Sequence, residues 1–234
     1  MNKSYKVLLV SATEAEIDPV IRHLKQHAAT ISFSQFNYKN LQIVPLVSGI
    51  GSTMMAFSLA RYKGLQDFNL IVHAGISGSF QRHIPIGSLV EVVSEQWGDL
   101  GAETIDGEFI DGFELNLMDS NRFPYQQTRL VKTKQVPDPN LPRVKGLTVN
   151  RTSGSQKNIE FLKAKYNCDI ESMEGAGLFY AAKIMDIPFV SIRCISNFVE
   201  PRDKLKWKIP EAIENLNKFI ISYFDALEIN SGIV

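Results

Sequence analysis

The sequence predicts an α/β fold, a three-layer α/β/α sandwich in which helices cover both faces of a central sheet. Two observations lead to this prediction. Continuous apolar runs such as YKVLLVSA (5–12) are typical of strands buried on both faces. Amphipathic segments separate these runs, and strands that alternate with helices indicate a layered α/β domain. A chain of 234 residues can bury one such core, so we expect a single domain over residues 1–234.

The first third of the chain holds the clearest alternation. After the strand at 5–12 comes a helix whose apolar residues recur at helical spacing, with Asp18-Pro19 as its expected cap and first turn. The pattern then predicts strands at 31–36 and 41–51, a helix ended by Gly64, and an apolar strand that runs into a glycine-containing turn (69–80).

The rest of the chain follows the same order around one irregular stretch. Residues 98–145 are rich in Gly, Asp, Asn and Pro, and so long a stretch is usually functional or holds short helices. The elements predicted around it are strands at 87–97, 146–155 and 188–197, helices at 156–167 and 171–186, and an amphipathic C-terminal helix that opens at Pro210.

Composition excludes several functions. Basic and acidic residues number 25 each, so no electrostatic footprint for nucleic acid or an anionic membrane is present. Cys168 and Cys194 both lie in apolar segments and are expected to be reduced core thiols. No apolar run reaches the length of a signal-peptide core or a membrane span. We therefore expect a soluble cytoplasmic protein.

Polar residues follow three predicted strands at the point where each apolar run stops. These are Ser11 to Glu14, Gly75 to Ser79, and Ser196-Asn197. Glu174, in the stretch ESMEGAG, begins a predicted helix beside them. Sites in α/β folds gather at the carboxyl ends of strands, so these side chains are expected to share one site.

This set suits the cleavage of an N-glycosidic bond. Glu14 is placed to take a proton from an attacking water, a contribution of about 10²- to 10⁴-fold. Glu174 can accept hydrogen bonds from two ribose hydroxyls and offset the positive charge that develops on the sugar, with Met173 as an apolar floor. Asn197 can donate its amide N–H to N7 of a departing purine.

Each of these residues also has a structural interpretation. Glu14 and Glu174 can be first-turn acids that favour the helix dipole, and Asn197 can cap the turn after a strand. His73, inside an apolar strand, is read as a hydrogen-bonded core histidine. His23 and His27 are four residues apart, but no zinc motif is complete, so no metal is expected.

Together these segments resemble the nucleoside phosphorylase/nucleosidase superfamily across nearly the whole chain. The resemblance rests on VSATEAEI, AGISGSF, ESMEGAG and IRCISN. Within the superfamily, EQWGDLGAE, DGFELNL and ISNFVEPRDKLKWKI are most similar to the futalosine hydrolase family. The resemblance implies a mixed central sheet, hydrolysis of futalosine to hypoxanthine and dehypoxanthine futalosine in menaquinone biosynthesis, no cofactor, and a homo-oligomer, with a dimer favoured. It gives the roles above to Glu14, Met173, Glu174 and Asn197, and a lining role to Ile76.

Two departures from the superfamily pattern bear on the reaction. Adenosine-type nucleosidases usually carry an aspartate where this chain has Asn197, and an amide NH₂ can donate toward N7 and O6 of a 6-oxopurine. Leaving such groups unpaired costs about 1–3 kcal/mol, so the substitution favours hypoxanthine. His73 stands where phosphorylases carry a phosphate-binding arginine, and Glu14 and Glu16 would repel an anion. Water is therefore the expected nucleophile.

Three alternatives remain open. They are a methylthioadenosine/S-adenosylhomocysteine nucleosidase, a purine nucleoside phosphorylase, and a catalytically silent nucleoside-binding module. The resemblance also implies a benzoate on the 5′ group of the substrate, which should meet a cation. The sequence offers several without choosing among them, including Arg82, Arg122, Arg151 and Arg202.

Overall fold

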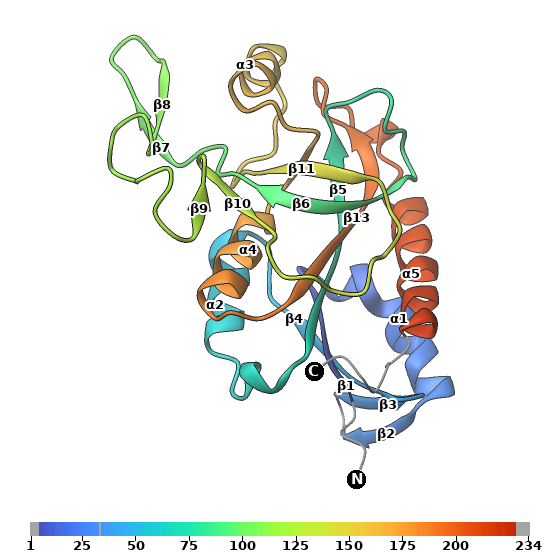
Figure 1. Ribbon diagram of the computed structural model, residues 1–234. Coiled ribbons are helices and arrows are strands. Elements are labelled where there is room, and N and C mark those ends of the chain that lie inside the picture. The colour runs from blue at the N-terminus through green and yellow to red at the C-terminus, as the bar shows by residue number, and fades with distance from the viewer. Residues whose placement is uncertain (1–4, 33, 228–234) are drawn as a thin grey trace.

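The computed structural model describes residues 5–32 and 34–227, and most of its strands belong to one mixed sheet (Figure 1). Its eleven strands follow the order β2-β3-β4-β1-β5-β12-β11-β6-β10-β9, and β13 pairs with both β5 and β6. Parallel and antiparallel pairs occur side by side, which confirms the mixed sheet. The predicted strand at 31–36 includes Phe33, which lies outside the described residues.

Strand β1 (Tyr5–Ser11) lies in the interior of the sheet and separates two cores. It runs parallel to both β4 (Leu41–Val47) and β5 (Leu70–Ser79). Because side chains alternate along a strand, Val7 and Leu9 enter one core and Leu8 and Val10 the other. Helices α1 (Glu14–His27) and α5 (Ile209–Ala226) cover the first core, and α2 (Ser52–Ala60) and α4 (Gly175–Ile184) cover the second.

Half of the sheet departs from the predicted three-layer sandwich because it closes into a barrel. Strand β5 pairs with β12 (Ile170–Ser172), β12 with β11 (Arg143–Thr148), and β11 with β6 (Leu89–Glu95). Strand β13 (Phe189–Phe198) then pairs with both β6 and β5 and completes the ring. Strands β5 and β13 have ten residues each, which gives twisted strands enough length to pair with different neighbours at their two ends.

Shorter elements surround this centre. Strands β2 (Ala29–Ser32) and β3 (Gln35–Tyr38) extend one edge, and β10 (Arg129–Val131) and β9 (Tyr125–Gln126) the other. Strands β7 (Gly101–Glu103) and β8 (Phe109–Asp111) form a separate hairpin that projects from the body in Figure 1. The stretch 98–145 thus contains short strands rather than short helices. Helix α3 (Gln156–Tyr166) packs on a small third core.

Helix α1 begins four residues before the predicted cap, and Pro19 lies inside it. A proline in a helix removes one backbone donor and disturbs the ladder around it. Asn217 of α5 repairs this defect: its Oδ1 accepts from the N–H of Val20 (3.0 Å), and its Nδ2 donates to the carbonyl of Glu16 (2.8 Å). A contact across about two hundred residues decides this helix boundary, so the local sequence could not reveal it.

Two other boundaries also differ from the predictions. Residues predicted as one helix at 171–186 form the end of β12, then Glu174 as the N-cap, then α4. Strand β5 continues through Gly75 and Gly78 to Ser79, where a turn was expected. Both differences place polar backbone and side-chain groups beside the ends of β1 and β13.

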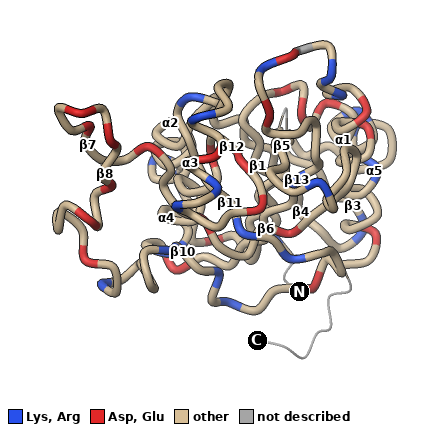
Figure 2. The backbone as a smooth tube through the Cα atoms, turned by 90° about the horizontal axis from the view of Figure 1, so that it is seen from above, with Lys and Arg blue, Asp and Glu red and all other residues tan. Residues whose placement is uncertain are grey.

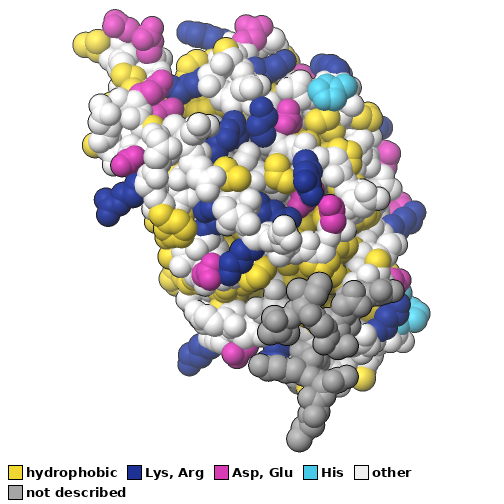
Figure 3. Space-filling view, in the orientation of Figure 1, with side chains coloured by type: hydrophobic (Ala, Val, Ile, Leu, Met, Phe, Trp, Pro, Cys, Tyr) yellow, Lys and Arg dark blue, Asp and Glu magenta, His cyan; other side chains and the backbone are white. Residues whose placement is uncertain are grey.

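The charged side chains do not gather into one basic face. Figure 2 shows Lys and Arg interspersed with Asp and Glu along the chain, and Figure 3 shows the same mixture on the surface. Cys168 and Cys194 are buried and unpaired, as predicted. Among the described residues, no helix is long and apolar enough to cross a membrane.

Candidate functional site

Glu174 is the N-cap of α4 and is buried, so it is not a solvated first-turn acid. Its Oε1 accepts from the N–H of Gly51 (3.0 Å), and its Oε2 lies 3.9 Å from Nη2 of Arg193. Burial raises the pKa of Glu174, and the Arg193 charge and the Gly51 hydrogen bond oppose that increase, whereas the charge of Glu16 adds to it. Three segments far apart in the sequence therefore meet at this carboxyl group.

Arg193, on β13, is fully buried and is held by His73 of β5. Nη2 of Arg193 lies 2.8 Å from Nε2 of His73, and Nδ1 of His73 lies 3.1 Å from Oγ of Ser191. Burial and the arginine charge place the pKa of His73 well below its usual value. The histidine is therefore neutral, and it accepts from Arg193 through Nε2. The interpretation of His73 as a hydrogen-bonded core histidine is confirmed.

Gly75 provides the space in which Arg193 and Glu16 approach one another. A Cβ atom at this position would lie 1.8 Å from Nη1 of Arg193 and 3.1 Å from Oε1 of Glu16. No side chain fits at that distance, so glycine is required while the arginine keeps its place. Nε and Nη1 of Arg193 have no hydrogen-bond partner among the described residues.

Glu16 occupies the place that the sequence predicted for Glu14. Its Oε2 accepts from the backbone N–H (3.0 Å) and the hydroxyl (3.1 Å) of Thr13, and its Oε1 accepts from the N–H of Ile76 (3.2 Å). A carboxylate has about four acceptor positions, so one remains open. Glu16 is 7% exposed.

Glu14, the first residue of α1, is exposed. Residues two apart on an α-helix point about 200° away from each other, so Glu14 and Glu16 cannot share one environment. The structure therefore places Glu16, and not Glu14, near Glu174, which corrects the expected position of Glu14; the catalytic role stays a prediction.

Asn197 lies near the end of β13, opposite Gly78 of β5. Its Oδ1 lies 2.8 Å from Oγ of Ser196, and its Nδ2 donates to the carbonyl of Phe198 (3.0 Å). Gly78 follows Ile76 by two residues, a rise of about 7 Å along a strand. Asn197 is therefore paired with β5 at a position about 7 Å beyond Ile76, whose N–H donates to Glu16.

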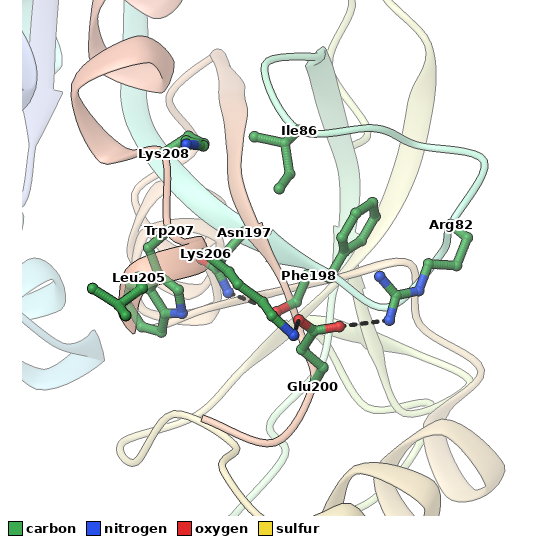
Figure 4. A pocket seen from close by; sticks show the side chains of 9 residues that line it. All are labelled: Arg82, Ile86, Asn197, Phe198, Glu200, Leu205, Lys206, Trp207 and Lys208. Atoms are coloured by element: carbon green, nitrogen blue, oxygen red, sulfur yellow. Dashed lines mark hydrogen bonds and ion pairs between the residues drawn. The ribbon is translucent and has the colours of Figure 1, made fainter. Parts of the chain in front are cut away.

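Asn197 also lines a cavity of about 460 Å³, shown in Figure 4. It is the one predicted site residue among those lining the cavity. The other lining residues are Arg82, Ile86, Phe198, Glu200, Leu205, Lys206, Trp207 and Lys208.

Two further predicted residues are neighbours of Glu174 and Glu16. Met173 is half-buried and directly precedes Glu174, and its role as a floor for the sugar stays a prediction. Ile76 contributes its backbone N–H to Glu16, while its side chain packs against the core under α1 and α5. Its assigned lining role also stays a prediction.

Sequence reasoning missed Glu16, Gly75 and Arg193 as members of the site. One signal for Glu16 was present, because Thr13-x-x-Glu16 is a capping box, and Glu16 lies closer than Glu14 to the stripe formed by Ile17, Val20 and Leu24. Arg193 lies in an apolar strand, where nothing local distinguishes a functional arginine.

Comparisons with known proteins concern the family and the fold of the chain. The family described as the phosphorylase superfamily matches residues 6–225. A futalosine hydrolase of Streptomyces coelicolor is 32% identical over 189 residues, which cover 78% of this chain and 79% of that protein. A futalosine hydrolase of Acidothermus cellulolyticus is 28% identical and covers 91% of this chain and 88% of its own.

Solved structures share the fold at low identity. A Helicobacter pylori 5′-methylthioadenosine/S-adenosylhomocysteine nucleosidase superposes with a TM-score of 0.77 and 16% identity, covering 97% of this chain and 100% of its own. A futalosine hydrolase of the same organism also has a TM-score of 0.77 and 16% identity, covering 96% and 99%. At this identity the two structures establish the fold and do not separate the two activities.

Proposed function

We propose, from the premise that this chain belongs to the phosphorylase superfamily and within it to the futalosine hydrolase family, that it hydrolyses the N-glycosidic bond of futalosine and releases hypoxanthine. The observation that carries the proposal is the convergence of two buried carboxylates, Glu16 beside Ile76 of β5 and Glu174 beside Arg193 of β13. Asn197 of β13 pairs with Gly78, two residues beyond Ile76 on β5.

The two carboxylates have different surroundings and therefore different roles. Glu16 has three donors fixed on it and one acceptor position left, which suits a base that takes a proton from water as the water attacks C1′. Glu174 is held by Gly51 and lies near Arg193, and it can accept hydrogen bonds from the ribose hydroxyls. Negative charge at Glu174 offsets the positive charge of the developing oxocarbenium ion.

Water is the nucleophile that the electrostatics favour. The one fully buried cation of the cluster, Arg193, has a carboxylate at 3.9 Å and a neutral histidine in contact. A phosphate dianion at this point would face Glu16 and Glu174 with a single arginine to balance it. A purine nucleoside phosphorylase is therefore the weaker alternative.

The orientation of the Asn197 amide favours hypoxanthine over adenine as the leaving base. Oγ of Ser196 lies 2.8 Å from Oδ1 of Asn197, an orientation that leaves the NH₂ group with a free hydrogen for N7 or O6. A 6-amino group would present a donor to that NH₂ group, and the mismatch costs about 1–3 kcal/mol. This distinguishes the proposal from the methylthioadenosine/S-adenosylhomocysteine nucleosidase alternative.

The proposal is tested by incubating the purified protein with futalosine, inosine and methylthioadenosine, each with and without phosphate, and measuring the free base. We expect hypoxanthine from futalosine at a rate that does not depend on phosphate. Release that requires phosphate would identify a phosphorylase. Preferred release of adenine would identify the other nucleosidase, and binding without any release would identify a silent module.

We expect Asn197→Asp to lower kcat/KM for futalosine more than for methylthioadenosine, by about tenfold in the ratio of the two. The carboxylate replaces a donor with an acceptor, which meets O6 unfavourably but can accept from a 6-amino group. The two kcat/KM values are measured for the wild type and the variant. Equal losses on both substrates would refute the assignment of base recognition to Asn197.

A further inference from the structure

The cavity beside Asn197 carries more positive than negative charge. Three cationic side chains, Arg82, Lys206 and Lys208, line it, and Glu200 is the one carboxylate among its lining residues. Apolar and aromatic side chains form the rest of the wall (Figure 4). A ligand that suits this wall therefore has an apolar body and an anionic group.

Glu200 forms ion pairs with two of the three cations, and the group of three keeps one net positive charge. Its Oε2 lies 2.6 Å from Nη2 of Arg82, and its Oε1 lies 3.3 Å from Nζ of Lys206. The hydrogen bond from Arg82 is the main reason that the pKa of Glu200 is below its usual value, and Lys206 lowers it further. Lys208 differs from both, because no carboxylate within the described chain pairs with its side chain.

The backbone places Lys208 close to the site that recognises the base. Its N–H donates to the carbonyl of Ser196 (2.8 Å), the residue before Asn197. Lys208 is also the N-cap of α5, an 18-residue helix whose amino terminus adds positive potential at this point. An anion held by Lys208 would be stabilised both by the ammonium charge and by the positive potential of the helix terminus.

Two aromatic rings of the wall lie in contact with cations. The guanidinium of Arg82 lies 4.3 Å from the ring centre of Phe198, and that of Arg202 lies 5.4 Å from the ring of Trp207. Such cation–π contacts favour a fixed position of the two rings. Among the arginines considered from sequence, Arg82 is the one that lines the cavity.

We propose that this cavity binds a carboxylate carried by the 5′ substituent of the substrate, with Lys208 as its ion-pair partner and the Arg82–Glu200–Lys206 group as a fixed rim. The inference rests on the proposed function, since it concerns the part of the nucleoside that is not cleaved. Lys208 is then a specificity-determining residue, because neutral nucleosides do not use it.

The experiment compares futalosine with its methyl ester, which lacks the negative charge and retains the rest of the molecule. In the wild type we expect kcat/KM to be about three- to fivefold higher for the acid, which corresponds to one charge pair at an exposed lysine. Lys208→Gln should lower kcat/KM for futalosine by about the same factor and leave the ester nearly unchanged. Lys208→Arg should retain most of the preference for the acid.

Lys206→Gln is the matched control, since it removes a charge from the same wall whose side chain already has Glu200 as an ion-pair partner. Its effect on futalosine should be smaller than that of Lys208→Gln. Equal losses on acid and ester in Lys208→Gln, or no loss on either, would overturn the proposal. Inorganic phosphate is the other anion that a cationic cavity could take, and competitive inhibition by phosphate that persists in Lys208→Gln would also count against the assignment.

The design separates this inference from the proposed function. If the wild type cleaves neither futalosine nor its ester, the proposed function fails. Calorimetric binding of futalosine and its ester to the wild type and to Lys208→Gln then still decides whether Lys208 recognises the carboxylate, through the same comparison of acid with ester.

Discussion

Replacing Glu16 with glutamine is expected to lower kcat for futalosine by about 10²- to 10⁴-fold, the range for loss of a general base. The amide keeps the shape of the side chain and can still accept one hydrogen bond from Thr13 or Ile76. It cannot take a proton from water. KM should change little, because the ribose contacts assigned to Glu174 and the base contact assigned to Asn197 are retained.

Glu14→Gln is the matched control for this prediction. The two glutamates lie in the same helical turn, but Glu14 is exposed and Glu16 is buried. Glu14→Gln should therefore leave kcat within about twofold of the wild type, as for most exposed substitutions. Thermal melting of both variants shows that they fold, since glutamine is accepted at this position of a capping box. A large loss in Glu14→Gln together with an active Glu16→Gln would return the role to Glu14.

The alternation of apolar runs and amphipathic segments predicted the strands at the centre of the sheet, because burial on both faces leaves a clear signature. Sequence patterns could not predict that β13 pairs with two strands and closes a barrel, since register and closure depend on partners far along the chain. The start of α1 was missed for the same reason, because Asn217 supplies the hydrogen bonds that allow Pro19 inside the helix.

The sequence predicted which segments form the site, but it did not always predict which residue of a segment belongs to it. Glu174 and Asn197 stood out because polar residues interrupt apolar runs there. Choosing between Glu14 and Glu16 required the helix phase, which depends on where the helix begins. Arg193 and His73 sit within strands, and only the register that pairs β13 with β5 brings them together.

Another acid near the start of α4, Glu95 of β6, is fully buried. Its Oε2 accepts from Oγ1 of Thr148 (2.9 Å), and that oxygen accepts from the N–H of Ala176 (2.7 Å) in the first turn of α4. A Cβ atom at Gly175 would lie 1.9 Å from Oε1 of Glu95, which explains the glycine that follows Glu174. Glu95 thus supports the helix that presents Glu174.

Burial raises the pKa of Glu95 to about 7, against the lowering influence of Thr148, Arg193 and Arg129. In the unfolded chain the group has its ordinary value of about 4.3. Between these two values the folded protein binds a proton that the unfolded chain has released, so the free energy of unfolding falls as pH rises through this range. The loss amounts to about 4 kcal/mol above pH 7, at 1.36 kcal/mol per pKa unit.

We therefore expect Glu95→Gln to be more stable than the wild type at pH 8.5, by up to about 4 kcal/mol, and nearly equal to it at pH 5. The amide is neutral at both pH values and can still accept from Thr148. Urea denaturation at the two pH values gives the free energies of unfolding. Glu91→Gln on the same strand is the control, because Glu91 is buried against Lys132 and Arg143, and removing its charge leaves Lys132 without its carboxylate partner. Glu91→Gln should destabilise the protein at pH 8.5. If Glu95→Gln did the same, Glu95 would be ionised and paired with the arginines. An ion pair, rather than a neutral hydrogen-bond chain, would then hold the start of α4.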